Sequence, residues 1–368
     1  FTSRDGLHLS DDPVLYDEDY CSGAKGVPGS GDAITTVTGG APGEVFVGYH
    51  GVTAVNGDCT DPAADRHSGK LDRVRLQADG TLQVQRLDMV STGMGMSFWH
   101  NRTVYRMAYD HVIHPHTLYV GTDHGVDMML PDRYRDPRPG EWTGFSIQEW
   151  MSDHLHVQVC FHDDPTCLAG GEGNARMGDW RGLAIAPDGD LWHAGRWSGG
   201  KIRWIADLTQ WNMRSGGVAY AEAFGNGGSV PVFPVAQIGD VVSLSSVTVA
   251  ADGSAWFGRA FFYEAGAGGI AHYLGNGQFE YHSPSSELGL PTDDVQDLVA
   301  LPDGRLVVAS ARAGLVFWNP TTGDRKALRA GQGIPDDHVT QLELDTMVNP
   351  PALHVSTAGG SAVIRAFP

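Results

Sequence analysis

Histidines are the residues of this chain whose type and placement could do chemistry. The sequence holds sixteen of them among 368 residues. Neutral imidazole is a ligand that both zinc and copper accept, so histidines from separate strands can surround one cation. Zinc or copper suits such ligands better than calcium or magnesium, which prefer oxygen. Four histidines at the ends of predicted strands form the first candidate metal site: His50, His100, His124 and His338.

A second group of histidines lies in the middle of the chain. His154 and His156 are separated by one residue, which places both imidazoles on one side of a strand. His162 follows shortly after them and completes an alternative metal site. Three further histidines interrupt a predicted turn and are expected on the opposite face from the first site: His111, His114 and His116.

Charged residues at the same strand ends supply candidate catalytic groups. An arginine there could orient an anionic or carbonyl substrate, and a carboxylate could act as a general base beside a metal-bound water. The candidates are Asp179, Arg196, Arg259 and Asp294. The sequence lacks the GxSxG, HExxH and phosphate-binding glycine motifs, so no particular reaction is indicated.

The elements that must position these residues are short strands separated by glycine-rich turns. The segment Gly289–Val295 returns 44 residues later as Gly333–Val339. A four-residue pattern marks the second strand of each unit and occurs six times. Its first place is apolar, its second is aromatic or apolar, its third is apolar, and its fourth is a small residue. In one of the six units a histidine, His193, takes the third place. The pattern begins at Val45, Leu118, Leu191, Ala255, Leu306 and Leu353. Inner strands are predicted just before it, at 34–38, 104–109, 180–185, 244–249, 295–300 and 339–344.

A period near 44 residues made of short strands is typical of a β-propeller blade. The sequence therefore predicts an all-β fold, a single β-propeller domain over residues 1–368, with six blades favoured and seven as the alternative. The first three blades carry insertions of roughly 20 to 30 residues relative to that period. The chain ends one strand short of a blade, and Gly6–Ser10 is predicted to supply the missing outer strand and close the ring.

The last two units resemble the repeats of the two-component-regulator type propeller family. The matching residues lie between about 286 and 360: Gly-Leu-Pro, then Asp-Val, then the run Pro302–Leu306, then Gly314 and Leu315. The resemblance implies the propeller fold and a ligand-sensing module outside the cytoplasm. It implies no catalytic residue, because fold alone does not transfer an active site.

The net charge and the cysteines limit which binding partners and which cellular location the sequence supports. The formal net charge of −19 argues against nucleic acid, whose phosphates need a basic face. No apolar stretch reaches the roughly 20 residues that a membrane helix needs. The four cysteines predict two disulfide bonds, for which three pairings are possible. The favoured pairing joins Cys160 to Cys167 and Cys21 to Cys59. These cysteines, and a start at Phe1 that resembles a mature terminus, predict a secreted or periplasmic protein.

Two functions follow from this sequence. The first is a metal-binding protein, with the ion held by histidines at the mouth of the central channel, acting as a metal-dependent hydrolase or lyase. The alternative is a non-catalytic propeller that presents the same mouth to a small molecule, carbohydrate, peptide or partner protein. The sequence indicates no oligomeric state.

Overall fold

The computed structural model describes the strands and turns of the chain and the connections around them. The described residues are 7–9, 12–16, 18–19, 24–25, 34–49, 71–87, 104–113, 116–122, 126–129, 131–133, 153–155, 180–195, 198–202, 232–234, 244–260, 268–275 and 278–368. These residues form strands, with two short helical turns, so the predicted all-β class is confirmed. None of the described helices is long and apolar enough to cross a membrane.

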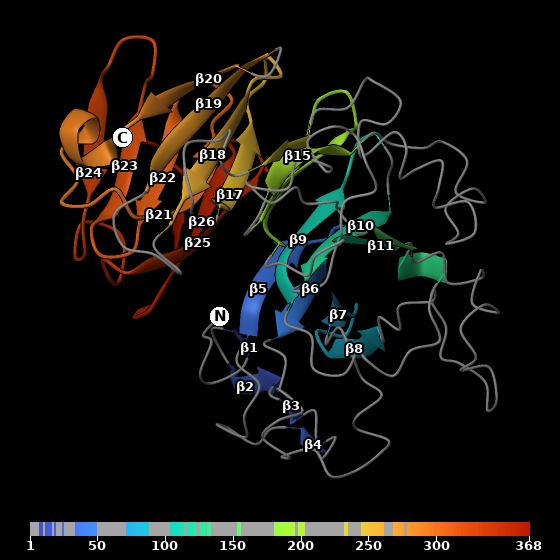
Figure 1. Ribbon diagram of the computed structural model, residues 1–368. Helices are drawn as coiled ribbons and strands as arrows, with labels where there is room; N and C mark the ends of the chain where they lie inside the picture. The colour runs from blue at the N-terminus through green and yellow to red at the C-terminus, as the bar shows by residue number, and fades with distance from the viewer. Residues whose placement is uncertain are drawn as a thin grey trace, which may run out of the picture. The chain divides into compact units, whose positions relative to one another are not determined.

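Most strands belong to antiparallel sheets in which each strand pairs with the next along the chain (Figure 1). The first two sheets consist of β5 (Ile34–Gly39), β6 (Glu44–Tyr49), β7 (Leu71–Leu76), β8 (Leu82–Leu87), and of β9 (Val104–Asp110), β10 (Thr117–Thr122), β11 (Val126–Met129), β12 (Asp153–Leu155). The next two consist of β13 (Trp180–Ile185), β14 (Leu191–Gly195), β15 (Ser198–Ile202), β16 (Val232–Pro234), and of β17 (Leu244–Val249), β18 (Ala255–Arg259), β19 (Gly269–Gly275), β20 (Gln278–His282).

Two more sheets complete the described series. They consist of β21 (Val295–Ala300), β22 (Leu306–Ser310), β23 (Gly314–Trp318), β24 (Arg325–Leu328), and of β25 (Val339–Asp345), β26 (Ala352–Thr357), β27 (Gly360–Ile364). The 3₁₀ helix η4 (Pro131–Arg133) follows β11, and the π-helix η7 (Pro284–Leu288) follows β20. Successive four-stranded meanders of this kind are β-propeller blades. The total number of blades stays a prediction, because the last described sheet has three strands.

The predicted N-terminal strand forms and pairs with the strand that follows it. β1 (Leu7–Leu9) pairs with β2 (Asp12–Tyr16), and β3 (Glu18–Asp19) pairs with β4 (Ala24–Lys25). The sheet that ends with β27 has three described strands. Closure of the ring by the N-terminal strand stays a prediction.

The chain divides into two compact units. The N-terminal unit comprises Phe1–Val157, Arg176–Trp180 and Trp204–Ala221, and the C-terminal unit comprises Gln158–Ala175, Arg181–Arg203 and Glu222–Pro368. Within the C-terminal unit the inner strands β17, β21 and β25 lie side by side in sequence order. Within the N-terminal unit β5 and β9 do the same. The predicted organisation of residues 1–368 as one domain stays a prediction.

Side chains join neighbouring inner strands through hydrogen bonds to the backbone. Ser245 Oγ donates to the carbonyl of Val295 at 2.6 Å. The amide of Leu342 donates to Asp297 Oδ2 at 2.7 Å, and Asp297 is only 2 % exposed. Because unpaired buried backbone groups are costly, these polar side chains stabilise the contact between sheets. Polar residues on inner strands therefore serve the scaffold.

The repeated segment that starts at Gly289 and Gly333 connects one sheet to the next. Gly289 and Gly333 have φ angles of 70° and 118°, which favour glycine. Each is followed by a buried apolar residue, Leu290 or Ile334, that packs with a core cluster. An aspartate, Asp293 or Asp337, lies three residues after this apolar residue. Its backbone carbonyl accepts a hydrogen bond from the amide of the first residue of the third strand of a sheet, Gly269 for Asp293 and Gly314 for Asp337. Its carboxylate accepts a hydrogen bond from a backbone amide earlier in the chain, that of Ser285 for Asp293 and of Ala330 for Asp337.

The small residue of the second-strand pattern has a steric cause. A Cβ atom on Gly48 would lie 2.5 Å from Val104, and one on Gly121 would lie 2.3 Å from the carbonyl oxygen of Trp180. Val104 and Trp180 are the first residues of the next inner strands. The glycine is therefore needed where the next inner strand begins.

Replacing Gly121 with alanine is expected to destabilise the N-terminal unit by roughly 1–3 kcal/mol, because the contacted atom is a backbone oxygen that cannot rotate away. The matched control is Gly39→Ala, whose Cβ would meet nothing within 4 Å. That variant should stay within about 0.5 kcal/mol of the parent chain. Denaturant unfolding followed by tryptophan fluorescence measures both. Equal stability of the two variants would contradict the steric explanation.

Candidate functional site

Most residues of the predicted sites lie outside the described part of the chain. The undescribed candidates are His50, His100, His124, His156, His162, Asp179 and Arg196, and the same holds for Cys21, Cys59, Cys160 and Cys167. His154 lies in β12 opposite Asp127 on β11. The predicted metal sites and disulfide bonds therefore stay predictions. In the described ranges, no group of three or more His, Cys, Asp or Glu side chains could hold a metal ion.

Beside His154, three residues of the predicted metal and catalytic sites are described. Arg259 ends β18 and is 8 % exposed, so it is buried. Asp294 is half-buried, and its carboxylate accepts a hydrogen bond from Gln296 Nε2 at 2.9 Å. His338 is exposed, and its backbone amide donates to Asp336 Oδ1 at 2.7 Å while its carbonyl accepts from Ala358. These hydrogen bonds of Asp294 and His338 stabilise the local backbone where an inner strand begins.

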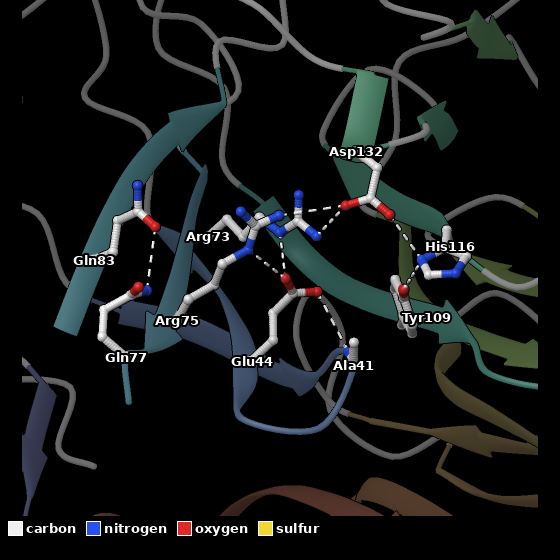
Figure 2. A network of polar contacts seen from close by, with 9 residues as sticks. All are labelled: Ala41, Glu44, Arg73, Arg75, Gln77, Gln83, Tyr109, His116 and Asp132. Atoms are coloured by element: carbon white, nitrogen blue, oxygen red, sulfur yellow. Dashed lines mark hydrogen bonds and ion pairs between the residues drawn. The ribbon is translucent and has the colours of Figure 1, made fainter. Parts of the chain in front are cut away.

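The most extensive described network of charged side chains lies in the N-terminal unit (Figure 2). Arg73 and Arg75 alternate along β7, so both project from one face of its sheet. Glu44 begins β6 and lies opposite Arg75. Asp132 lies in η4, and His116 precedes β10. The network therefore joins one sheet to elements of the following sheet.

Two carboxylates hold the two arginines. Glu44 Oε2 accepts from Nε of Arg73 and, at 2.9 Å, from Nε of Arg75. Asp132 Oδ1 accepts from an Nη2 atom of Arg73 at 2.5 Å and of Arg75 at 3.3 Å. The side chains of Glu44 and Arg73 are 4 % and 3 % exposed. The Arg73 guanidinium also lies 5.8 Å from the ring centroid of Phe46.

One end of the network reaches solvent. His116 Nδ1 lies 2.8 Å from Asp132 Oδ2 and 3.3 Å from Tyr109 Oη. The side chains of Arg75, Asp132 and His116 are 36 %, 43 % and 56 % exposed. Buried charges thus fix the position of exposed ones. Figure 2 shows this path from Glu44 through the arginines and Asp132 to His116.

The electrostatics of the network favour a charged Asp132 and a neutral Tyr109. Burial alone raises the pKa of Asp132, but the hydrogen bond and charge of Arg73, with His116 and Arg75, lower that pKa below its ordinary value. Burial and the charges of Glu44 and Asp132 raise the pKa of Tyr109 to about 12. Tyr109 therefore keeps its proton at neutral pH.

This arrangement is not that of a proton relay. A catalytic histidine contacts its orienting carboxylate through one ring nitrogen and the reacting hydroxyl through the other. Here Asp132 and Tyr109 both contact the same atom, Nδ1 of His116. A tyrosine with a raised pKa is also a poor nucleophile. The network can hold a partner's polar groups, and its geometry does not support activation of Tyr109.

His116 was predicted only within a histidine cluster, and the other members of the network were not predicted. An Arg-x-Arg pair on a strand, with Glu44 29 residues before Arg73, was the available signal. The sequence carries no signal for Asp132, because its position beside the arginines depends on where η4 lies after β11 of the following sheet.

Comparisons with known proteins define similarity of fold only. No family model and no curated protein matches the chain. Among solved structures, the extracellular domain of the hybrid two component system BT4673 from B. thetaiotaomicron has 13% identity and a TM-score of 0.46, covering 95% of this chain and 39% of that one. Sqt1 of Saccharomyces cerevisiae has 11% identity and a TM-score of 0.47, covering 91% and 73%.

A third similar structure is PorZ, a bacterial surface component of the type-IX secretion system of Porphyromonas gingivalis. It has 11% identity and a TM-score of 0.42, covering 93% of this chain and 48% of that one. The chain thus spans about two fifths of BT4673's extracellular domain and about half of PorZ. At these identities and TM-scores, the similarity says nothing about function.

Proposed function

We propose that the chain is a non-catalytic β-propeller that binds a ligand or partner protein outside the cytoplasm. The observation that carries the proposal is the network around Arg73. Its buried Glu44–Arg73 pair fixes the exposed Arg75, Asp132 and His116 side chains. Groups held in place before binding lose little conformational entropy on binding, which favours recognition. The even number of cysteines supports the location.

The ligand classes are a small molecule, a carbohydrate, a peptide or a protein. An acidic chain with net charge −19 attracts cationic partners over neutral ones through its long-range field. Within that field, Arg75 and Asp132 offer a paired donor and acceptor to a polar group. The metal-dependent hydrolase or lyase suggested by the sequence stays the competing prediction, with its histidines outside the described residues apart from His338 and His154.

The test is a binding screen of the purified chain on oligosaccharide and peptide arrays, with hits measured by calorimetry. The variant Arg75→Ala/Asp132→Asn should bind a hit at least about tenfold more weakly than the parent chain, a loss of about 1.4 kcal/mol. The matched control removes another surface ion pair, Asp303→Asn/Arg305→Ala, whose atoms lie 2.7 Å apart, and should bind normally. A screen without hits, equal binding by both variants, or turnover of a bound compound would overturn the proposal.

A further inference from the structure

The turn between β9 and β10 exposes two adjacent aliphatic side chains. Val112 is 78 % exposed and Ile113 is 42 % exposed. Side chains exposed to this degree add little to the stability of the fold, because an apolar side chain stabilises a protein by being buried. In three other sheets the turn at this place is polar and contains an Asp-Gly pair, namely Asp188–Gly189, Asp252–Gly253 and Asp303–Gly304.

The backbone of this turn is held at both ends. Asp110 is buried, and its Oδ1 atom accepts hydrogen bonds from the amides of Val112 at 2.9 Å and Ile113 at 2.8 Å. At the other end His116 has a φ angle of 70°, which residues other than glycine rarely adopt. Such a conformation persists where the surroundings hold it, and Asp132 contacts the His116 ring. The two aliphatic side chains are therefore presented in a fixed place, which keeps the entropy cost of binding low.

The exposed turn lies at the same end of the N-terminal unit as the Arg73 network. Ion pairs link His116 at the end of this turn to Asp132, and Asp132 to Arg75 near the end of β7 (Figure 2). The residue after Arg75 is Leu76, which ends β7 and is 55 % exposed. Exposed aliphatic side chains thus occur on both of the sheets that the network joins. Grouped exposed apolar side chains with polar ones around them are typical of a surface that binds a protein or peptide.

The exposed charge at this end of the unit is acidic. Asp79 lies exposed in the turn after β7, where the hydroxyl and the amide of Thr81 donate to its carboxylate and lower its pKa. The pKa of the half-exposed Asp132 is also below its ordinary value. Both carboxylates are therefore charged at neutral pH, in a chain whose net charge is −19. The exposed cation beside them, Arg75, is already paired with Glu44 and Asp132. A cationic partner complements this charge.

We infer that this end of the N-terminal unit binds a peptide segment of a partner protein, and that the segment combines aliphatic with basic side chains. Its aliphatic side chains pack on Val112, Ile113 and Leu76. Its basic side chains face Asp79 and Asp132. A carbohydrate offers neither the aliphatic side chains nor the positive charge that this surface complements. The inference rests on the proposed function and names its ligand class.

The experiment selects binders of the purified full chain from short random peptides displayed on phage. The enriched peptides should contain Lys or Arg together with aliphatic or aromatic residues. A synthetic copy of the most enriched peptide is then measured by calorimetry. Val112→Ser/Ile113→Ser should bind it at least about tenfold more weakly than the parent chain, because both aliphatic contacts are lost. Added salt should weaken binding to the parent chain, because ions screen the carboxylates.

The matched control is Met347→Ser, which removes a 57 % exposed apolar side chain from the turn between β25 and β26. This variant should bind the peptide as the parent chain does. Urea unfolding checks that Val112→Ser/Ile113→Ser keeps the stability of the parent chain, as expected for exposed positions.

Enriched peptides that lack basic residues, or that bind Val112→Ser/Ile113→Ser as tightly as the parent chain, would overturn the inference. A peptide whose binding is lost only in Arg75→Ala/Asp132→Asn would overturn it and leave the proposed function intact. A selection that enriches no peptide would overturn it as well, whereas an oligosaccharide could still satisfy the proposed function. Sedimentation that shows a dimer of the parent chain, abolished in Val112→Ser/Ile113→Ser, would assign the surface to a second copy instead.

Discussion

Replacing Glu44 with alanine should destabilise the N-terminal unit by about 3–5 kcal/mol, the cost of leaving a buried charge without its partner. Arg73 is 3 % exposed and lies against Glu44, Asp132 and the Phe46 ring. Without Glu44, the Arg73 guanidinium keeps one carboxylate partner, Asp132, which is 43 % exposed. Glu44 also accepts a hydrogen bond from the Ala41 amide at 3.3 Å, so the turn between β5 and β6 is weakened too.

The matched control for this prediction is Arg75→Ala. Arg75 contacts the same two carboxylates as Arg73 but is 36 % exposed, so water screens its charge. Its loss should cost no more than about 1 kcal/mol. Urea unfolding of both variants, followed by fluorescence, measures the difference. Similar losses for the two variants would show that burial does not set the strength of these pairs.

The parts of the fold that sequence predicted are those determined by short-range patterns. The predicted inner strands 180–185, 244–249 and 295–300 match β13, β17 and β21. The glycine-rich turns between strands form as expected, with Gly189, Gly253 and Gly304 at φ angles of 88°, 86° and 85°. These features depend on strand alternation and on residues that tolerate positive φ, and both can be read over a few residues.

The parts that sequence could not predict depend on contacts between distant segments. Asp132 contacts Arg73 across 59 residues, and no local pattern joins them. The short hairpin of β1 with β2 was not predicted, and closure of the ring by the N-terminal strand stays a prediction. The candidate site around Arg73 is therefore visible only in three dimensions.

The buried histidine His193 should make the C-terminal unit sensitive to acid. It occupies the third place of the second-strand pattern, where Val120, Phe257 and Val308 are all fully buried. His193 is likewise 0 % exposed, and burial lowers its pKa from 6.5 to about 3. In the unfolded chain the same imidazole takes up a proton near pH 6.5.

The sign of the effect follows from these two pKa values. Above pH 6.5 neither state holds the proton, so His193 leaves stability unchanged. Below pH 6.5 the unfolded chain binds one more proton than the folded chain, and stability falls by about 1.4 kcal/mol per pH unit until about pH 3. The lowered pKa of His272 and of His354 adds a loss of the same sign below their ordinary values.

The window between pH 6.5 and 4.5 separates the histidines from the carboxylates. Asp188 and Asp303 also have lowered pKa values, but their stabilisation is lost only when pH falls below their ordinary value of 3.8. Across these two pH units His193 alone should cost about 2.7 kcal/mol. His193→Phe places in β14 the side chain that Phe257 already provides in β18, and it should remove this part of the slope.

Urea unfolding at several pH values between 6.5 and 4.5 measures the slope for the parent chain, His193→Phe and the control His338→Ala. His338 is exposed, so its loss should leave the slope of the parent chain unchanged. An unchanged slope in His193→Phe would mean that the folded state accommodates a proton on this imidazole. Because the other third-place residues are apolar, a reduced slope would instead show that one histidine in an apolar position makes this blade depend on pH.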